Sequence, residues 1–364
     1  MSLGARAEIR LEALRQNHQL LRSRVPGSRV LAAVKANAYG HGIVPVSQAL
    51  ADEVDAFAVA RLVEAETLRS AGIDREIVLM GGVLDATELY RARDLECDLV
   101  VHADYQVELL RGFSGASFRV WLKVDTGMHR LGIYPEAVPG VLERLRTSSA
   151  VRRLGFMTHL ANADDVGDRT STQQFERFAA LADGFDGDVS VANSAALLGW
   201  ADDVRIDGHW HVTGDTWIRP GVSLYGVSPL SGCTAQSLGL EPVMNFEAPL
   251  IAVKRLAAGE RVGYGGVWTA PTDTVLGIAA AGYGDGYSRV IPPDTPVLVN
   301  GRRAGLAGVV SMDLLAVNLG ADANDAIGDT VRLWGQGLPV EDIAAAAGTT
   351  AYALVTGVRN RDAV

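Results

Sequence analysis

A lysine at the end of an apolar run is the residue in this sequence best placed for covalent chemistry. Lys35 follows the run Val30–Val34 and begins a polar, glycine-rich turn that extends to Gly42. Burial at a strand end would lower the pKa of the amine and give a neutral nucleophile, as Schiff-base chemistry requires. A surface lysine on an edge strand is the simpler alternative. Only three of the 33 basic residues are lysines, and arginine cannot do amine chemistry, which favours the functional interpretation.

Other polar side chains with acid–base or anion-binding capacity also follow apolar, β-branched runs. They are Asp125, His159, the pair Asn193–Ser194 and the triplet Arg219–Gly221. In parallel barrels the C-terminal ends of the strands meet at one mouth, where such enzymes carry their catalytic groups. We therefore expect these side chains to converge with Lys35.

The apolar runs recur with a regular spacing in the first two-thirds of the chain. They are Val30–Val34, Ala56–Ala60, Ile77–Met80, Leu99–His102, Phe118–Val124, Leu154–His159, Val189–Ala192 and Ile218–Leu224. Helix-like segments lie between most of them. Roughly eight units of about 25–30 residues have the size of βα repeats, and uninterrupted apolar runs are typical of strands buried on both faces. The sequence predicts an N-terminal (β/α)8 TIM-type barrel over residues 1–232.

The pattern of apolar and polar residues changes after about Ser231. Strand-like runs replace the helical periodicity, and they are Ala248–Lys254, Arg261–Thr269, Thr274–Ala281, Thr295–Val299, Val309–Val317 and Thr330–Trp334. Pairs such as Asn300–Gly301 mark turns between them, and Pro339–Ala347 is predicted as a short helix. Residues 233–364 are therefore expected to form a separate, mainly-β C-terminal domain of an α/β protein.

Composition excludes several classes of function. The 364 residues carry a formal charge of −10, and 48% of them are hydrophobic, which fits a globular protein and argues against a nucleic-acid or anionic-membrane surface. Cys97 and Cys233 cannot make a disulfide framework or a zinc site by themselves, and no metal site is predicted. No secretion signal or membrane-length apolar run is recognisable, so we expect a soluble, cytoplasmic protein.

The segment Lys35–Gly42 resembles the cofactor lysine motif of the alanine racemase family, a group of fold-type III pyridoxal-phosphate enzymes. Six further segments resemble blocks of that family in the same order, and they are Lys123–Gly132, Thr158–Asp164, Asn193–Ala196, Arg219–Gly226, Val262–Gly265 and Ser311–Asp313. The resemblance extends from about Ala7 to at least Asp313. It implies a βα barrel followed by a β domain, which agrees with the division predicted above.

This resemblance implies an amino-acid racemase, an isomerase that depends on pyridoxal 5'-phosphate and has alanine as its default substrate. Lys35 would hold the cofactor covalently and carry protons on one face of the substrate, and Tyr264 would serve the opposite face. His159 and Arg219 would assist Tyr264, because a free tyrosine has a pKa of about 10. Without the resemblance, Tyr264 would be interpreted as a packed aromatic residue and His159 equally well as a hydrogen-bonded barrel histidine.

Arg219 discriminates between reactions of related enzymes. A cation bonded to the pyridine nitrogen of the cofactor disfavours protonation of that nitrogen, and fold-type III decarboxylases have an acidic residue in this place. The resemblance therefore implies reversible proton transfer and argues against a decarboxylase. A non-catalytic pyridoxal-phosphate-binding protein is a further alternative, but such proteins lack the β domain that contains Tyr264. An isolated strand-end arginine would be interpreted as part of a surface salt bridge.

The family's cofactor site extends beyond Lys35, Arg219 and His159. By resemblance, the phosphate would bind the side chains of Ser194 and Tyr39 and the backbone N–H groups of Gly221 and Val222, which glycine allows to approach closely. Ser194 taken alone could be a helix N-cap, and the two roles are compatible.

The substrate carboxylate would bind Arg130 and the backbone N–H of Met312. In several family members the residue that matches Lys123 is carbamylated and orients the arginine, whereas an unmodified Lys123 paired with Asp125 is the alternative. Tyr264 and Met312 reach the site of the partner subunit in this family. The resemblance therefore implies a head-to-tail homodimer with shared active sites.

Two departures from the family lie on the substrate side. Val309 stands where family members commonly have an arginine that lines the substrate corridor, and Asn360 stands near a position where a tyrosine often contacts the phosphate. Loss of a corridor charge suggests altered access or a different or broader set of amino acids. D-alanine would serve as a peptidoglycan precursor or in another pathway, and the sequence leaves this choice open.

Overall fold

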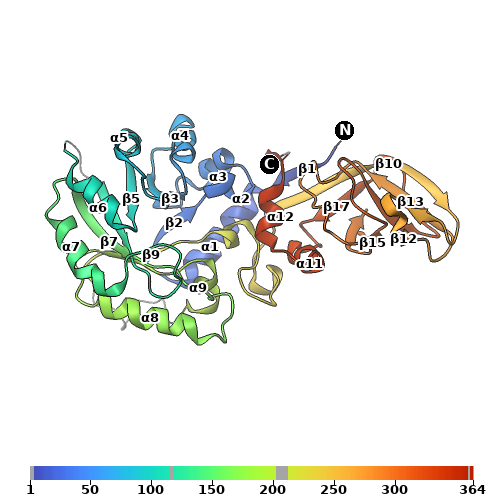
Figure 1. Ribbon diagram of the computed structural model, residues 1–364. Coiled ribbons are helices and arrows are strands. Elements are labelled where there is room, and N and C mark those ends of the chain that lie inside the picture. The colour runs from blue at the N-terminus through green and yellow to red at the C-terminus, as the bar shows by residue number, and fades with distance from the viewer. Residues whose placement is uncertain (1–3, 115–117, 202–211, 360, 364) are drawn as a thin grey trace.

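The computed structural model of the protein describes residues 4–114, 118–201, 212–359 and 361–363. Two bodies lie side by side along the molecule, a helix-covered parallel barrel and an antiparallel β body (Figure 1). Within the described ranges, no helix is both long and apolar enough to cross a lipid bilayer.

Eight parallel strands form the predicted barrel, which confirms the expected fold class. In spatial order they are β8 (Asp188–Ser190), β7 (Val151–Met157), β6 (Phe118–Lys123), β5 (Cys97–Val101), β4 (Glu76–Leu79), β3 (Ala56–Val59), β2 (Arg29–Ala33) and β9 (Trp217–Ile218). Parallel bridges from Val189 to Thr216 and from Asn193 to Arg219 close the sheet between β8 and β9. Every residue of β3, β5, β6 and β8 is buried, which accounts for the uninterrupted apolar runs.

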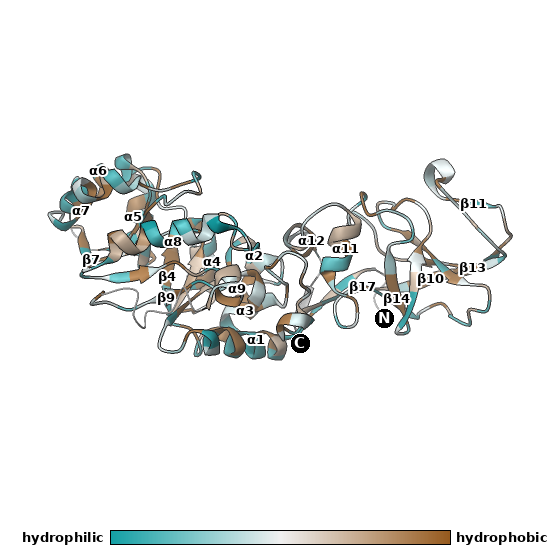
Figure 2. Cartoon of the chain, turned by 90° about the horizontal axis from the view of Figure 1, so that it is seen from below, coloured by the Kyte–Doolittle hydropathy of each residue, from teal (hydrophilic) through white to brown (hydrophobic). Residues whose placement is uncertain are grey.

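Helices connect the strands and cover the outside of the barrel (Figure 1). They are α1 (Leu11–Arg24), α3 (Ile43–Leu50), α4 (Leu62–Ser70), α5 (Ala86–Asp94), α6 (Asp104–Arg111), α7 (Val138–Arg146), α8 (Arg169–Ala182) and α9 (Ser194–Gly199). Short 3-10 turns lie at η1 (Pro135–Ala137), η2 (Val222–Tyr225) and η3 (Gln236–Leu238). Each helix buries one apolar stripe, as Phe175 and Phe178 of α8 do, and α8 presents hydrophilic residues in Figure 2.

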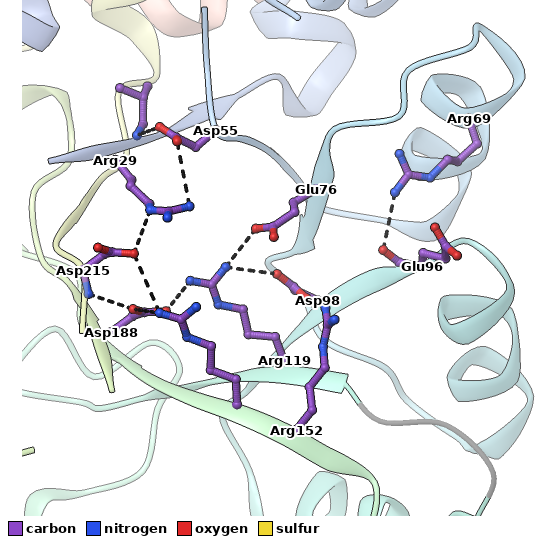
Figure 3. Close-up of polar contacts among 12 residues, drawn as sticks. Arg29, Asp55, Arg69, Glu76, Glu96, Asp98, Arg119, Arg152, Asp188 and Asp215 are labelled. Atoms are coloured by element: carbon purple, nitrogen blue, oxygen red, sulfur yellow. Dashed lines mark hydrogen bonds and ion pairs between the residues drawn. The ribbon is translucent and has the colours of Figure 1, made fainter. Parts of the chain in front are cut away.

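A cluster of charges around the buried side chain of Arg119 closes the N-terminal end of the barrel (Figure 3). The guanidinium of Arg119 donates to Glu76 at 2.8 Å and to Asp188, and its Nη1 lies 3.8 Å from the Asp98 carboxylate. It also lies over the rings of Trp121 and Trp217, at 4.9 and 4.5 Å from their centroids. Carboxylates and aromatic faces thus compensate this buried cation.

A second sheet forms the β body. Its strands, in spatial order, are β13 (Thr274–Ala279), β16 (Leu315–Gly320), β15 (Arg302–Leu306), β14 (Pro296–Val299), β17 (Thr330–Trp334), β10 (Met244–Leu256), β1 (Arg6–Ile9) and β18 (Arg361–Ala363), and β13 also pairs with β10. A hairpin of β11 (Arg261–Val262) and β12 (Trp268–Thr269) carries η4 (Tyr264–Gly266). The N-terminal strand β1 pairs with β10, so these first residues of the predicted 1–232 domain belong to the other sheet.

Two C-terminal helices join the bodies. Helix α11 (Val340–Ala346) corresponds to the predicted helix, and α12 (Ala351–Gly357) packs against α2 (Lys35–Tyr39), as Figure 1 shows. A Cβ atom on Gly40 would overlap the carbonyl of Val355, so only glycine allows this approach. The helix α12 therefore lies directly behind the turn that contains Lys35.

The predicted strand Val309–Val317 is wrong in its first half. Residues 309–314 form a turn, in which the N–H of Ser311 donates to the carbonyl of Leu314 at 2.9 Å, and the strand begins at Leu315. The N–H of Gly284 donates to the carbonyl of Met312 at 2.7 Å, so a neighbouring loop holds this turn out of the sheet.

Candidate active site

A cavity of about 360 Å³ opens at the C-terminal ends of the barrel strands. Its lining includes nine residues that the sequence singled out, which are Lys35, Tyr39, Arg130, His159, Asn193, Ser194, Arg219, Gly221 and Val222. The remaining lining residues are Ala33, Ala58, Met80, Ala195 and Tyr352. The expected convergence at the mouth of the barrel is therefore present, except for Asp125, which does not line the cavity.

Lys35 is the first residue of a left-handed turn. Ala36, Asn37, Ala38 and Tyr39 have φ angles of 53, 54, 53 and 50°, each of which costs about 1–2 kcal/mol for a residue with a side chain. Hydrogen bonds offset this cost, because Glu64 accepts from the N–H of Ala36 at 2.7 Å and Asn37 accepts from the N–H of Ile43 at 2.8 Å. Strain that is held in place by such contacts is typical of a functional segment.

The environment of Lys35 suits amine chemistry. Desolvation by the surrounding protein lowers the pKa of its amine, and the positive charges of Arg130 and Arg219 lower it further. A larger fraction of the amine is therefore neutral at a given pH, which covalent catalysis by lysine requires.

Arg219 enters the cavity from the segment after β9, and its guanidinium is buried. It donates to the carbonyl oxygens of Thr158 at 2.5 Å and Val191 at 3.1 Å, and to the hydroxyl of Ser190. All these acceptors are neutral, and among the described residues no carboxylate forms an ion pair with Arg219. Burial consequently lowers the pKa of Arg219 to about 10. The cation is fixed in position and uncompensated.

The cavity as a whole is cationic. The pKa of His159 lies well below its ordinary value, chiefly because of burial and then because of the charges of Arg219, Lys123, Arg130 and Lys35. His159 is therefore neutral near pH 7, so its ring can accept a hydrogen bond as well as donate one. A pocket of this charge fits a ligand with phosphate and carboxylate groups.

A small cradle lies on one side of the cavity. The hydroxyl of Ser194 accepts from the N–H groups of Gly221 at 2.8 Å and Ser223 at 3.3 Å. A Cβ atom on Gly221 would lie 2.6 Å from the Tyr39 hydroxyl, so this glycine leaves space that any other residue would fill. Tyr39 packs on Tyr225 with ring centroids 5.1 Å apart. Hydroxyls and a glycine backbone around a small space fit a phosphate group.

Lys123 lies at the end of β6, beneath the loop that carries Arg130. Burial and the neighbouring cations Arg219 and Arg130 lower the pKa of its amine to about 8. The alternative pairing with Asp125 is not formed, because that carboxylate accepts instead from the N–H groups of Gly127 at 3.1 Å and His129 at 3.0 Å. These bonds shape the loop in which Arg130 projects into the cavity.

Besides Lys123, two predicted site residues, Tyr264 and Met312, do not line the cavity. Both lie in the β body, with 67% and 56% of their surface exposed. The guanidinium of Arg289 lies 5.8 Å from the centroid of the Tyr264 ring. Two large exposed side chains in turns of this body are available to contact another molecule.

One cavity residue escaped the sequence analysis. Tyr352 of α12 lines the cavity, with its ring centroid 6.3 Å from that of Tyr39. In the sequence Tyr352 is an isolated tyrosine of the C-terminal segment, in which only Asn360 was predicted to lie near the cofactor. Asn360 lies outside the described residues.

The fold and the cavity together define a class of protein. It is a βα-barrel enzyme with an appended β body, which presents a reactive lysine and a cationic, glycine-lined cradle to an anionic cofactor and its substrate. The residues therefore fit pyridoxal phosphate, since an amine, a phosphate cradle and a cation beside them match its aldehyde, phosphate and ring.

Comparison with known proteins identifies the family. Residues 9–229 match the family model of the alanine racemase N-terminal domain, and residues 243–363 match that of the C-terminal domain. Alanine racemase of Aliivibrio salmonicida is 45% identical over 98% of both chains, and that of Shewanella amazonensis is 44% identical over 99% of this chain and 98% of its own. The crystal structure of biosynthetic alanine racemase from Pseudomonas aeruginosa covers 100% of both chains with a TM-score of 0.93 and 41% identity.

The chain therefore belongs to the alanine racemase family. It is an isomerase that depends on pyridoxal phosphate, as the sequence analysis predicted. Three alternatives are not favoured, which are a racemase of a different or broader set of amino acids, a decarboxylase and a non-catalytic binding protein.

Proposed function

We propose that the protein interconverts L- and D-alanine by moving the α-proton between Lys35 and Tyr264 on opposite faces of the substrate. When bound, pyridoxal phosphate withdraws electrons and acidifies the α-C–H bond. The observation that best supports this function is the cavity in which Lys35, Arg130 and Arg219 converge. Their combined charge favours the carboxylate of an amino acid and an anionic cofactor, and it disfavours the protonated amine of Lys35.

The remaining cavity residues receive the following roles. Ser194, Tyr39 and the backbone of Gly221 and Val222 would hold the phosphate of the cofactor, and Arg219 would bind its pyridine ring from the protein side. This assignment is supported by the orientation of Arg219, which three neutral acceptors fix from the protein side. Neutral His159 adjoins the hydroxyl of the second base and assists its proton transfer.

The substrate carboxylate binds Arg130 and the backbone N–H of Met312. The neutral amine of Lys123 adds to carbon dioxide and loses a proton to water, and the resulting carbamate anion holds Arg130. A pKa of about 8 supports this modification, because the neutral amine is the reactive form.

A head-to-tail homodimer completes each site. The cavity of one chain lacks Tyr264 and Met312, and both side chains are exposed in the β body. The partner subunit's Tyr264 and the partner subunit's Met312 would supply the second base and the carboxylate contact. We also propose that the protein acts in the cytoplasm.

The substrate corridor determines the range of amino acids. Val309 lies in the same turn as Met312, and its apolar side chain removes a charge from the expected path of the substrate. Restoring an arginine at Val309 should change KM or the ratio of kcat/KM between alanine and larger amino acids. Unchanged values for both would remove the corridor hypothesis.

Exchange of the α-proton tests the function directly. The holoenzyme is incubated in heavy water with a panel of L-amino acids, and chiral chromatography with mass detection follows each one. We expect deuterated D-alanine as the main product. Exchange confined to another amino acid would reassign the substrate, and absence of exchange with the cofactor bound would overturn the proposal.

A further inference from the structure

A buried glutamine joins the two strand ends that carry His159 and the Arg130 loop. Gln174 lies on α8, is fully buried and makes three hydrogen bonds. Its Oε1 accepts from the N–H of Ala161 at 2.8 Å, and its Nε2 donates to the carbonyl of His159 at 3.0 Å and to the hydroxyl of Thr126 at 3.2 Å. One side chain therefore holds the segment after β7 and the segment after β6 together.

The contact with Thr126 continues into an ordered chain of hydroxyls. The hydroxyls of Thr126 and Thr158 lie 2.8 Å apart, and the Thr158 hydroxyl donates to the carbonyl of Val124 at 2.9 Å. With that last donor fixed, the Thr126 hydroxyl must donate to Thr158, and Gln174 must donate to Thr126. Each proton in this chain has one direction, which fixes the orientation of the amide.

This network ends on residues of the site. The backbone carbonyl of Thr158 accepts from Arg219 at 2.5 Å, and the next residue is His159. Thr126 belongs to the loop that leads to Arg130, and its carbonyl accepts from Arg177 of α8 at 2.9 Å. A shift of Gln174 would therefore move His159 and Arg130 relative to each other.

The same construction recurs two units earlier in the barrel, without any proposed catalytic residue. Gln106 of α6 is 1% exposed, accepts from the N–H of His102 at 2.8 Å and donates to the carbonyl of Val83 at 3.2 Å. It thereby joins the segments after β5 and β4, as Gln174 joins those after β7 and β6. The barrel thus provides a matched pair of buried glutamines that differ in what they hold.

We propose that Gln174 is a positioning residue of the racemase, which sets His159 and the Arg130 loop at their working separation. This inference rests on the function proposed above, since it gives His159 and Arg130 their roles. Gln174 touches neither the cavity nor the reacting atoms, and it acts through the two segments that it connects.

The test compares Gln174→Met with Gln106→Met. Methionine keeps the length of each side chain but makes none of its hydrogen bonds, so both variants should show a similar drop in Tm. Only Gln174→Met should lower kcat, by about 10- to 100-fold, which is the usual effect of displacing a supporting contact in an active site. Retention of wild-type kcat per cofactor-loaded site in Gln174→Met would overturn the proposal.

Isotope effects separate positioning from general damage. If Gln174→Met slows mainly the proton transfer that His159 assists, this transfer limits the reaction in both directions. The α-deuterium isotope effect on kcat/KM should then rise with the enantiomer of alanine from which this transfer removes the α-proton. With the other enantiomer it should fall toward unity, because the slow transfer then does not break the labelled bond. Equal isotope effects in Gln174→Met, Gln106→Met and the wild type would contradict the proposal.

A second variant covers the case in which Gln174→Met does not fold. Thr126→Val cuts the hydroxyl chain but leaves the bonds from Gln174 to His159 and Ala161. It should raise the KM for alanine and weaken a carboxylate competitor by a similar factor, with little change in kcat. Unchanged KM and competitor affinity would refute the connection to the Arg130 loop. A wild-type enzyme that exchanges no α-proton would instead refute the function itself, so the two failures are distinguishable.

Discussion

Arg119 and Arg219 are both buried arginines of the same barrel, and they have opposite environments. At the N-terminal end, Arg119 is 3% exposed and interacts with Glu76, Asp98 and Asp188 (Figure 3). At the C-terminal mouth, Arg219 is 5% exposed and donates only to neutral oxygens. A buried cation without a counter-ion is unfavourable, so the mouth retains charge that an anionic ligand must neutralise.

The two ends of the barrel therefore have different functions. The closed end places its charges in pairs and contributes to the fold, whereas the mouth places Lys35, Lys123, Arg130 and Arg219 near one another and lowers the pKa values of both lysines. Binding of phosphate and carboxylate relieves this repulsion. The mouth is therefore expected to affect activity first and the closed end stability first.

The largest expected effect tests whether the mouth is complete in one chain. Lys35→Ala and Tyr264→Phe should each lower kcat by about 10²- to 10⁴-fold, because each removes one of two proton carriers. When the two variants are co-expressed, mixed dimers contain one site with both residues intact. Random mixing should restore about a quarter of wild-type activity in a two-fold dimer.

The control is each variant expressed with itself, which should remain inactive. Steady-state racemase assays on the purified mixture measure the recovery. A mixture as inactive as its components would contradict sites shared between subunits.

The second prediction concerns the closed end. Arg119→Met should lower the free energy of unfolding by about 3 kcal/mol, because the buried Asp188 and Asp98 carboxylates then keep only the half-exposed cations of Arg153 and Arg152. The kcat of the folded, cofactor-loaded protein should stay at the wild-type value. Denaturant unfolding and active-site titration measure the two quantities.

Arg152→Met is the matched control, since the Arg152 side chain pairs with Asp98 at 3.3 Å but is 57% exposed. Its cost should be no more than about 1 kcal/mol. Equal losses in Arg119→Met and Arg152→Met would show that burial does not distinguish these pairs.

The third prediction concerns the mouth of the barrel, where we expect a loss of activity without a loss of stability. Arg219→Met should lower kcat by about 10²-fold or more, because it removes an oriented cation from the reacting groups. The stability of the apo-protein should not fall, since the variant also removes a buried charge without a counter-ion. A loss of stability as large as that of Arg119→Met would break the distinction between the two ends.

Much of this organisation could be predicted from the sequence. Lys35 and Arg219 stand in long motifs, and the apolar strand runs before them are uninterrupted because both faces of each strand are buried. The position of Tyr352 could not be predicted, because it depends on the close approach of α12 to Gly40. The hydrogen bonds of Gln174 could not be predicted either, because its partners Thr126 and His159 come from other segments of the sequence. These segments meet only when the barrel closes.

The smallest expected effect is a dependence of apo-protein stability on pH and phosphate. The folded pKa of Lys123 is lowered from 10.5 to about 8, so between these pH values the unfolded chain binds more protons than the folded one. Stability from this group should therefore rise as pH rises from about 8 to 10.5. Inorganic phosphate in the cavity should stabilise the protein by about 1–3 kcal/mol, most strongly at the lower end of this pH range, where the amine is charged.

Lys123→Met should reduce both effects, whereas Lys254→Met, which changes an exposed lysine of β10, should leave them intact. Thermal unfolding of the apo-protein in bicarbonate-free buffer, with and without phosphate, measures both. Identical pH profiles for the two variants would show that the charges at the mouth are compensated after all, and that Arg119 and Arg219 do not differ in the way their contacts indicate.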